Sequence, residues 1–128
     1  MFSGHFPEVM NVSDDQVAIL WRSDVGGNVV EIMNLQSGKV IFSIDKRSSN
    51  INQILSVKMS GGRVAVCGRF GLNVRDDIVV FDVETAQMIF SVFEFLKPSQ
   101  NLSSQFILEK NRLIYFYGTN LVSAKFWF

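Results

Sequence analysis

The sequence has very little of the residue types that build catalytic and metal sites. Its 128 residues include one cysteine, Cys67, and one histidine, His5. A single cysteine rules out an internal disulfide and a cysteine-based metal site, and it agrees with a reducing compartment, the cytoplasm or nucleus. The histidine lies beside a glycine near the chain end and lacks the partners of a hydrolase triad. We therefore expect a protein that is not an enzyme, with no catalytic residues, no metal and no cofactor.

Excess charge and long apolar runs are missing as well. Twelve Lys and Arg balance twelve Asp and Glu, so the formal net charge is zero. A balanced chain lacks the basic surface that binds nucleic acid or anionic membranes. The longest apolar stretch, MIFSVFEFL, contains Glu94 and is far shorter than the roughly 20 residues of a spanning helix. The first fifteen residues have no signal-peptide core. We expect no nucleic acid and no membrane as partners.

Short runs of β-branched and aromatic residues fill the chain, and helical spacing is hard to find. Turn residues such as Ser60-Gly61-Gly62 and Gly118-Thr119-Asn120 separate the runs, which include QVAILW, RVAVCG, DIVVFDV and RLIYFYG. Short strands at intervals of about 8–12 residues predict an all-β sandwich, barrel or propeller. The runs are more continuous than alternating, which predicts strands that are covered on both faces. Cys67 lies inside such a run, and we expect a buried, inert thiol there.

The chain repeats itself. SDDQVAIL, SGGRVAVC and EKNRLIYF place Val17, Val64 and Leu113 at the same point, at offsets of 47 and 49 residues, and EIMNLQSGK matches VVFDVETAQ at an offset of 48. Periods of roughly 40–50 residues are typical of propeller blades, which are four-stranded sheets that need neighbours to bury their faces. We therefore predict one domain, 1–128, of about three antiparallel β-propeller-type blades. The approximate units are 6–50, 51–100 and 101–128, the last incomplete. A compact β-sandwich is the alternative.

One unit can be divided into four strands: 54–60, 63–70, 77–83 and 87–95. The last two strands are joined by a tight turn, headed by Asp82 here and by Asn34 in the first unit. The side chain of an Asn or Asp at that place can accept a hydrogen bond from the backbone of the same turn, and Gly38 can take a positive φ without steric cost.

This strand–turn–strand pattern resembles the third and fourth strands of a WD-repeat blade. The Trp-Asp place of that family is Met33-Asn34 in the first unit, Phe81-Asp82 in the second and Trp127-Phe128 in the third. Ser3-Gly4-His5 resembles the Gly-His pair that precedes an inner strand. The resemblance implies that His5 bonds within its blade to a Ser and an Asp of neighbouring strands, and Ser23 and Asp24 are the nearest candidates.

The resemblance also implies a non-enzymatic protein–protein interaction module or scaffold that works inside the cell. A closed propeller typically needs 4–8 blades. We therefore expect either a fragment of a longer propeller protein, or closure by self-association or by pairing with another propeller chain. Two further functions stay open: a small-ligand or carbohydrate-binding β domain, and a propeller enzyme with a site in its channel.

One loop has the composition of a binding site. The segment 68–77, GRFGLNVRDD, is longer and more charged than its counterpart 22–28, RSDVGGN. Arginine and aromatic residues carry much of the energy of protein interfaces, and loops on a rigid scaffold are common binding sites. The candidate interaction residues are Arg69, Phe70, Arg75 and Asp76.

Overall fold

The computed structural model describes residues 5–23, 28–45, 51–70, 77–92, 106–117 and 120–126, and they form three antiparallel sheets. The first sheet contains β1 (His5–Ser13), β2 (Gln16–Ser23), β3 (Val29–Asn34) and β4 (Val40–Ile44). The second contains β5 (Ile51–Ser60), β6 (Arg63–Phe70), β7 (Asp77–Asp82) and β8 (Gln87–Val92). The third contains β9 (Phe106–Leu108), β10 (Arg112–Tyr117) and β11 (Asn120–Lys125). In these ranges no helix is long and apolar enough to span a bilayer.

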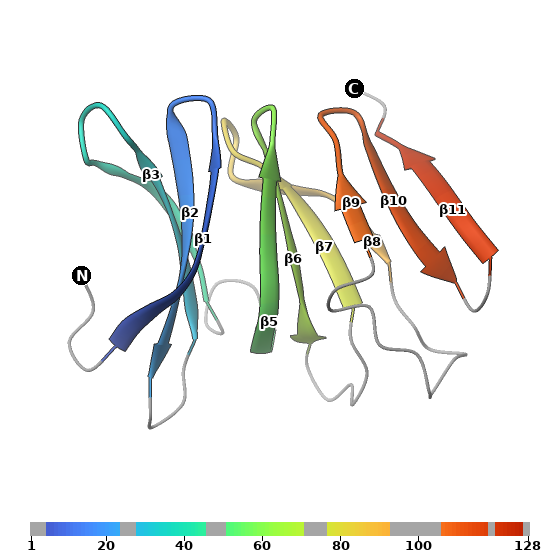
Figure 1. The fold of residues 1–128 in the computed structure, drawn as a ribbon, viewed down its shortest axis with the longest axis horizontal. Coiled ribbons are helices and arrows are strands. Elements are labelled where there is room, and N and C mark those ends of the chain that lie inside the picture. The colour runs from blue at the N-terminus through green and yellow to red at the C-terminus, as the bar shows by residue number, and fades with distance from the viewer. Residues whose placement is uncertain are drawn as a thin grey trace.

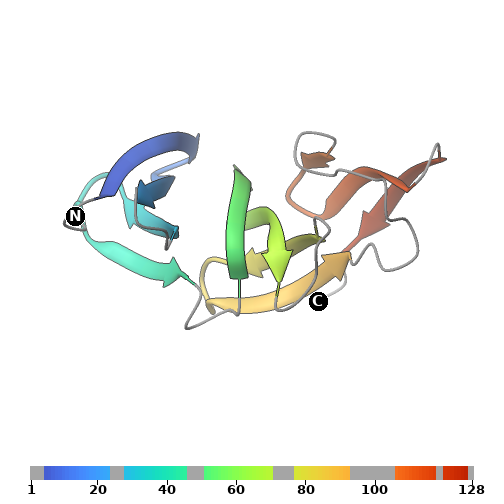
Figure 2. The same cartoon turned by 90° about the horizontal axis from the view of Figure 1, so that it is seen from below.

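Each sheet is a meander in which consecutive strands are neighbours. The three sheets stand side by side in the order of the sequence (Figure 1). Seen from below, they fan out along an arc, with the outer strands β4 and β8 along its lower side (Figure 2). The turns β1–β2, β3–β4, β5–β6, β7–β8 and β9–β10 lie along one edge, at the top of Figure 1. We call this edge the hairpin rim and the opposite edge, where β2, β6 and β10 end, the loop rim.

The strand register confirms the sequence repeat. Val17, Val64 and Leu113 are each the second residue of the second strand of a sheet, and all three are buried. One backbone hydrogen bond recurs beside each of them, with the N–H of Leu35, Val83 and Phe126 donating to the carbonyl oxygen of Asp15, Gly62 and Asn111 at 2.7–2.9 Å. Positions that share both the register and this bond are structurally equivalent in the three sheets.

The core consists of two layers, one between each pair of neighbouring sheets. The second sheet supplies alternate residues of the same strands to both layers: Val64 and Val66 of β6 pack toward the first sheet, and Ala65 and Cys67 toward the third. All four side chains are fully buried. This explains why the run VAVC is continuously apolar, and it confirms for the second sheet that strands are covered on both faces and that the cysteine is buried.

Side chains and backbone groups join the innermost strands of neighbouring sheets. The Asn11 side-chain oxygen accepts a hydrogen bond from the Met59 N–H at 2.7 Å, and the Ser13 hydroxyl accepts one from the Gly61 N–H at 3.0 Å. Lys58 donates to the Phe106 carbonyl oxygen, and its ammonium lies 4.4 Å from the centre of the Phe106 ring. In all three bonds the partners are 48 residues apart, so the period of the sequence is also the spacing of the contacts between sheets.

The packing of the sheets and the register of the strands correct two expectations. A two-sheet sandwich is wrong, because the second sheet packs on both faces against separate sheets. The assignment of Trp127 to the Trp-Asp place is also wrong. Met33 and Phe81 pair with Val17 and Val64, whereas the residue that pairs with Leu113 is Ala124. The cause is the link from β10 to β11, which is only residues 118–119 and brings the third strand forward in the sequence. Trp127 itself lies outside the described residues.

Candidate functional site

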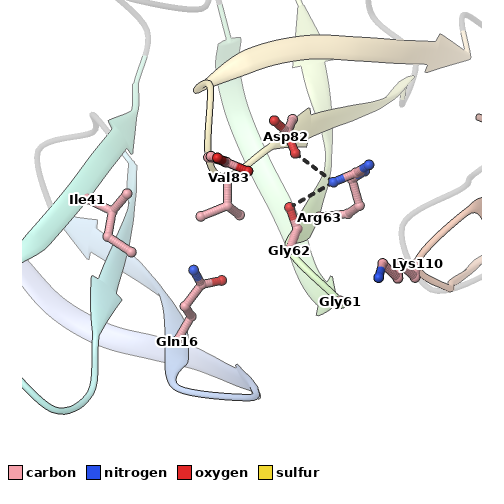
Figure 3. Close-up of a pocket in the computed structure, with 9 residues that line it drawn as sticks. Gln16, Ile41, Gly61, Gly62, Arg63, Asp82, Val83 and Lys110 are labelled. Atoms are coloured by element: carbon pink, nitrogen blue, oxygen red, sulfur yellow. Dashed lines mark hydrogen bonds and ion pairs between the residues drawn. The ribbon is translucent and has the colours of Figure 1, made fainter. Parts of the chain in front are cut away.

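The hairpin rim carries a hollow of about 440 Å³ to which all three sheets contribute. We call it the rim hollow (Figure 3). Its lining residues are Gln16 and Ile41 from the first sheet, Gly61, Gly62, Arg63, Asp82, Val83 and Glu84 from the second, and Lys110 from the β9–β10 turn of the third. The equivalence of the strands explains this position, because the same turn of each unit reaches the same edge.

An ion pair forms one wall of the rim hollow. The Arg63 Nη1 atom lies 2.6 Å from the Asp82 Oδ1 atom, and each side chain is 15% exposed. The same nitrogen donates to the Gly62 carbonyl oxygen at 3.4 Å, as Figure 3 shows. The two residues are direct partners across β6 and β7, so the sheet register holds the charges together. A pair that is held by the backbone and shielded from water is a rigid polar anchor.

Asp82 also organises the turn that follows it. Its Oδ2 atom accepts hydrogen bonds from the Thr85 N–H at 3.2 Å and the Thr85 hydroxyl at 2.9 Å. In the first sheet the Asn34 Oδ1 atom accepts from the N–H groups of Gln36 and Ser37, at 2.9 and 3.0 Å. The prediction that Asn34 and Asp82 head their turns by bonding the local backbone is confirmed. Asp82 therefore links the turn, through Arg63, to the wall of the rim hollow.

The β5–β6 turn forms the floor where the sheets meet. Gly61 and Gly62 have φ values of +52° and +79°, a conformation that glycine adopts without cost. The Gly61 N–H is held by Ser13 of the first sheet, and a Cβ atom at Gly61 would lie 2.8 Å from the Cβ and Cγ atoms of Lys110 of the third. Because Gly61 and Gly62 have no side chains, the first and third sheets can approach this turn closely. The Lys110 stem thus lies against glycine, with its side chain exposed at the rim.

The rim hollow combines opposite charges with apolar surface. Arg63 and Lys110 are cationic, Asp82 and Glu84 are anionic, and Ile41 offers a 39% exposed apolar side chain. Such a lining fits a chain segment that carries both polar and apolar groups better than it fits a strongly charged ligand. Among the described residues there is no group of three or more His, Cys, Asp or Glu residues placed to hold a metal ion.

Two of the four candidate interaction residues of segment 68–77 are described, and they belong to the opposite edge. Arg69 is exposed and lies near the end of β6, with Phe70 as the last residue of that strand. Both are therefore at the loop rim, away from the rim hollow. Arg75 and Asp76 lie outside the described residues. The structure thus separates two candidate surfaces that are built from one strand, β6.

The residues taken from the family resemblance are partly described. His5 begins β1, and the register pairs it with Ser23 at the end of β2. Asp24 lies outside the described residues. Arg22, next to Ser23 in β2, forms an ion pair with Glu8 of β1, and partial burial lowers the pKa of its guanidinium from the ordinary value.

Sequence reasoning selected Asp82 as the head of a turn, but it did not identify the rim hollow as a site. Gln16, Arg63 and Lys110 lie in or next to the repeated turns of SDDQ, SGGR and EKNR, which were interpreted only as markers of the period. Their places in equivalent turns of the repeat could have indicated that they lie together, because such turns of stacked units lie along one edge. The convergence itself depends on how the sheets are stacked.

Comparison with known proteins identifies the architecture. No protein-family model and no curated protein matches the sequence. The fold is similar to that of the Pyrococcus horikoshii acylaminoacyl peptidase, with a TM-score of 0.57, 16% identity, and coverage of 87% of this chain and 17% of that one. It is also similar to the β-propeller domain of the Trilobed protease from Pyrococcus furiosus, with a TM-score of 0.62, 16% identity, and coverage of 88% and 34%.

These likenesses and the three stacked meanders define the class. The described residues form β-propeller blades, two of four strands and one of three. The chain spans about a sixth and a third of the two chains to which it is similar. Because identity is 16% in both cases, the likeness establishes the fold.

Proposed function

We propose that this chain is a non-enzymatic, WD-like propeller segment that binds a segment of a partner protein at its hairpin rim, inside the cell. The observation that supports this most directly is the rim hollow, to which three sheets contribute side chains on tight turns. Binding surfaces on turns of a rigid scaffold lose little conformational entropy when they are occupied. The repeat of 47–49 residues and the turns headed by Asn34 and Asp82 support the WD-like type.

The lining defines the kind of segment that would fit. The Arg63–Asp82 pair is prepositioned, so a polar group of the partner can bond to it without first ordering two long side chains. Lys110 and Glu84 are exposed at the edge and offer one charge of each sign. Ile41 adds apolar contact area. An extended peptide with a central apolar residue and flanking charges of both signs matches these groups.

Both similar structures carry the word protease or peptidase in their names, but a shared propeller fold does not transfer an activity. We therefore do not assign a peptidase-linked role.

The test compares charge reversals at the rim hollow with alanine substitutions in segment 68–77. The chain is immobilised, partners are captured from cell extract and identified by mass spectrometry, and the dissociation constant of the main partner is measured. Glu84→Lys and Lys110→Glu are expected to raise that constant about tenfold or more, because each reversal places like charges of the chain and the partner segment opposite each other. Both side chains are exposed, so the melting temperature should stay within about 2 °C of the parent.

The matched control is the double change Arg69→Ala with Arg75→Ala in segment 68–77. If the rim hollow is the site, this control retains the parental dissociation constant. Loss of binding in the control, with binding unchanged in Glu84→Lys and Lys110→Glu, would assign the interaction to segment 68–77 instead. A chain that captures no partner while it is folded would contradict the interaction function.

A further inference from the structure

The arc has two apolar end faces whose positions are equivalent to faces that are buried inside it. The head face is the side of the first sheet that points away from the second. It contains Met10, Val12, Val17, Ile19, Glu31 and Met33, which share one side because they are direct cross-strand partners. The tail face is the side of the third sheet that points away from the second. It contains Ile107, Ile114, Leu121 and Ser123, and the same register places Arg112 and Lys125 on it at its hairpin-rim end.

The head face corresponds to the face of the second sheet that packs against the first. Met10 and Val12 of β1 occupy the positions of Val57 and Met59 of β5, as their pairing with the second strands shows. Met10 and Val12 are 62% and 58% exposed, whereas Val57 and Met59 are 2% and 7% exposed. Side chains of the same kind are therefore buried when a sheet covers this face and exposed where none does.

The tail face shows the same contrast. Leu121 of β11 occupies the position of Ile78 of β7, since each pairs with the equivalent residue of the strand before it. Leu121 is 66% exposed and Ile78 is fully buried. Ile107 of β9 adds a second apolar side chain, 58% exposed. The tail face therefore has the chemistry of the face that the second sheet presents to the third.

Glu31 on the head face and Ser123 on the tail face are chemically complementary. Glu31 is only 6% exposed on the head face, where its Oε1 atom accepts a hydrogen bond from the Trp21 indole N–H at 3.0 Å. A carboxylate has further acceptor positions. Ser123 is exposed on the tail face and carries a hydroxyl donor. A buried carboxylate is stabilised when a donor is placed opposite it.

The register puts these two residues at matching places. Ser123 occupies the position of Ile32 in the first sheet, and Glu31 occupies the position of Val79 in the second. Ile32 and Val79 belong to the same buried cluster between those sheets. If a tail face packs on a head face as the first sheet packs on the second, Ser123 therefore enters the same cluster as Glu31.

From this correspondence we propose that the tail face of one copy of the chain packs on the head face of a second copy. The contact is head-to-tail, and two copies close into a ring through two such contacts when the rotation between them is half a turn. Two copies of three sheets give six blades, which is within the usual 4–8 of a propeller. The apolar end faces are then buried by the same packing that already joins the sheets, and the Ser123 hydroxyl donates to the Glu31 carboxylate of the other copy.

The oligomeric state tests the proposal. Sedimentation velocity of the full chain is expected to give a dimer at micromolar concentration. Met10→Lys on the head face and Leu121→Lys on the tail face are both expected to raise the dissociation constant at least 100-fold, because each buries a charge in an apolar contact. Met88→Lys is the matched control, since Met88 is an exposed methionine of the second sheet, 58% exposed, and belongs to neither end face.

Mixing the two variants tests the head-to-tail arrangement. Met10→Lys retains a working tail face and Leu121→Lys a working head face, so an equimolar mixture is expected to form mixed dimers through one intact contact. A dimer joined head to head would be broken by Met10→Lys alone and would not be restored by mixing. That result, a monomeric parent chain, or an unaffected Leu121→Lys dimer would each overturn the proposal.

The polar pair is tested by Ser123→Ala. Because a hydrogen bond to a charged group is lost in each contact, the dimer dissociation constant should rise about tenfold or more. The side chain is exposed in the single chain, so the melting temperature measured at monomer concentrations should be unchanged. With Glu31→Gln already present, Ser123→Ala should have a smaller effect on the dissociation constant. Equal effects of Ser123→Ala in the two backgrounds would contradict the pairing of Ser123 with Glu31.

Discussion

The close approach of Lys110 to Gly61 provides a quantitative test of how the sheets meet. In Gly61→Ala, the residue must keep a φ of +52°, which costs an L-amino acid about 1–2 kcal/mol. Its Cβ atom would also lie 2.8 Å from the Cβ and Cγ atoms of Lys110, so the third sheet must shift. Overpacking of this kind costs about 1–3 kcal/mol. Together, we expect Gly61→Ala to lower the free energy of unfolding by about 2–5 kcal/mol.

Gly62 provides a matched control in the same turn. Its φ is +79°, but a Cβ atom there would have no neighbour within 4 Å. Gly62→Ala should therefore lose only the conformational part, about 1–2 kcal/mol. Urea unfolding followed by tryptophan fluorescence, at one protein concentration, measures both variants. A second change, Lys110→Gly, should recover the steric part in Gly61→Ala and nothing in Gly62→Ala. Equal losses in the two alanine variants would refute the close approach of the sheets.

Further changes address the ion pair, the contact between inner strands and one turn. Asp82→Ala removes the partner of Arg63 and the acceptor of its own turn, and should lower the free energy of unfolding by about 2–3 kcal/mol in urea titrations. Asn11→Ala leaves the Met59 N–H without its side-chain acceptor, and should lower the midpoint of thermal unfolding, at a cost of about 1–3 kcal/mol. Ala86 has a φ of +59°, so Ala86→Gly should raise the melting temperature slightly; a decrease would contradict strain at that turn.

The local structure could be predicted from the sequence because it depends on residue type and spacing. Val17, Val64 and Leu113 occupy equivalent positions in the sequence repeat, and in the structure each is the second residue of the second strand of its sheet. The turn heads Asn34 and Asp82 bond as their side chains allow over two or three residues. Neither conclusion requires knowledge of how one sheet lies on another. Where spacing alone was used across a link of different length, at Trp127, the prediction was wrong.

The sequence by itself therefore determined the strands, the period and the head of each turn, since these follow from hydrophobic runs and short-range hydrogen bonds. Only the tertiary structure decided which turns meet and which faces remain uncovered. Arg63, Lys110 and Gln16 are far apart in the chain, and stacking of the sheets brings them to one hollow. Glu31 and Ser123 stand in ordinary strand positions, and their place on opposite end faces comes from the register. The order of residues in a strand determines which side chains share a face of the sheet. Which other sheet covers that face is decided by packing between units about 48 residues apart.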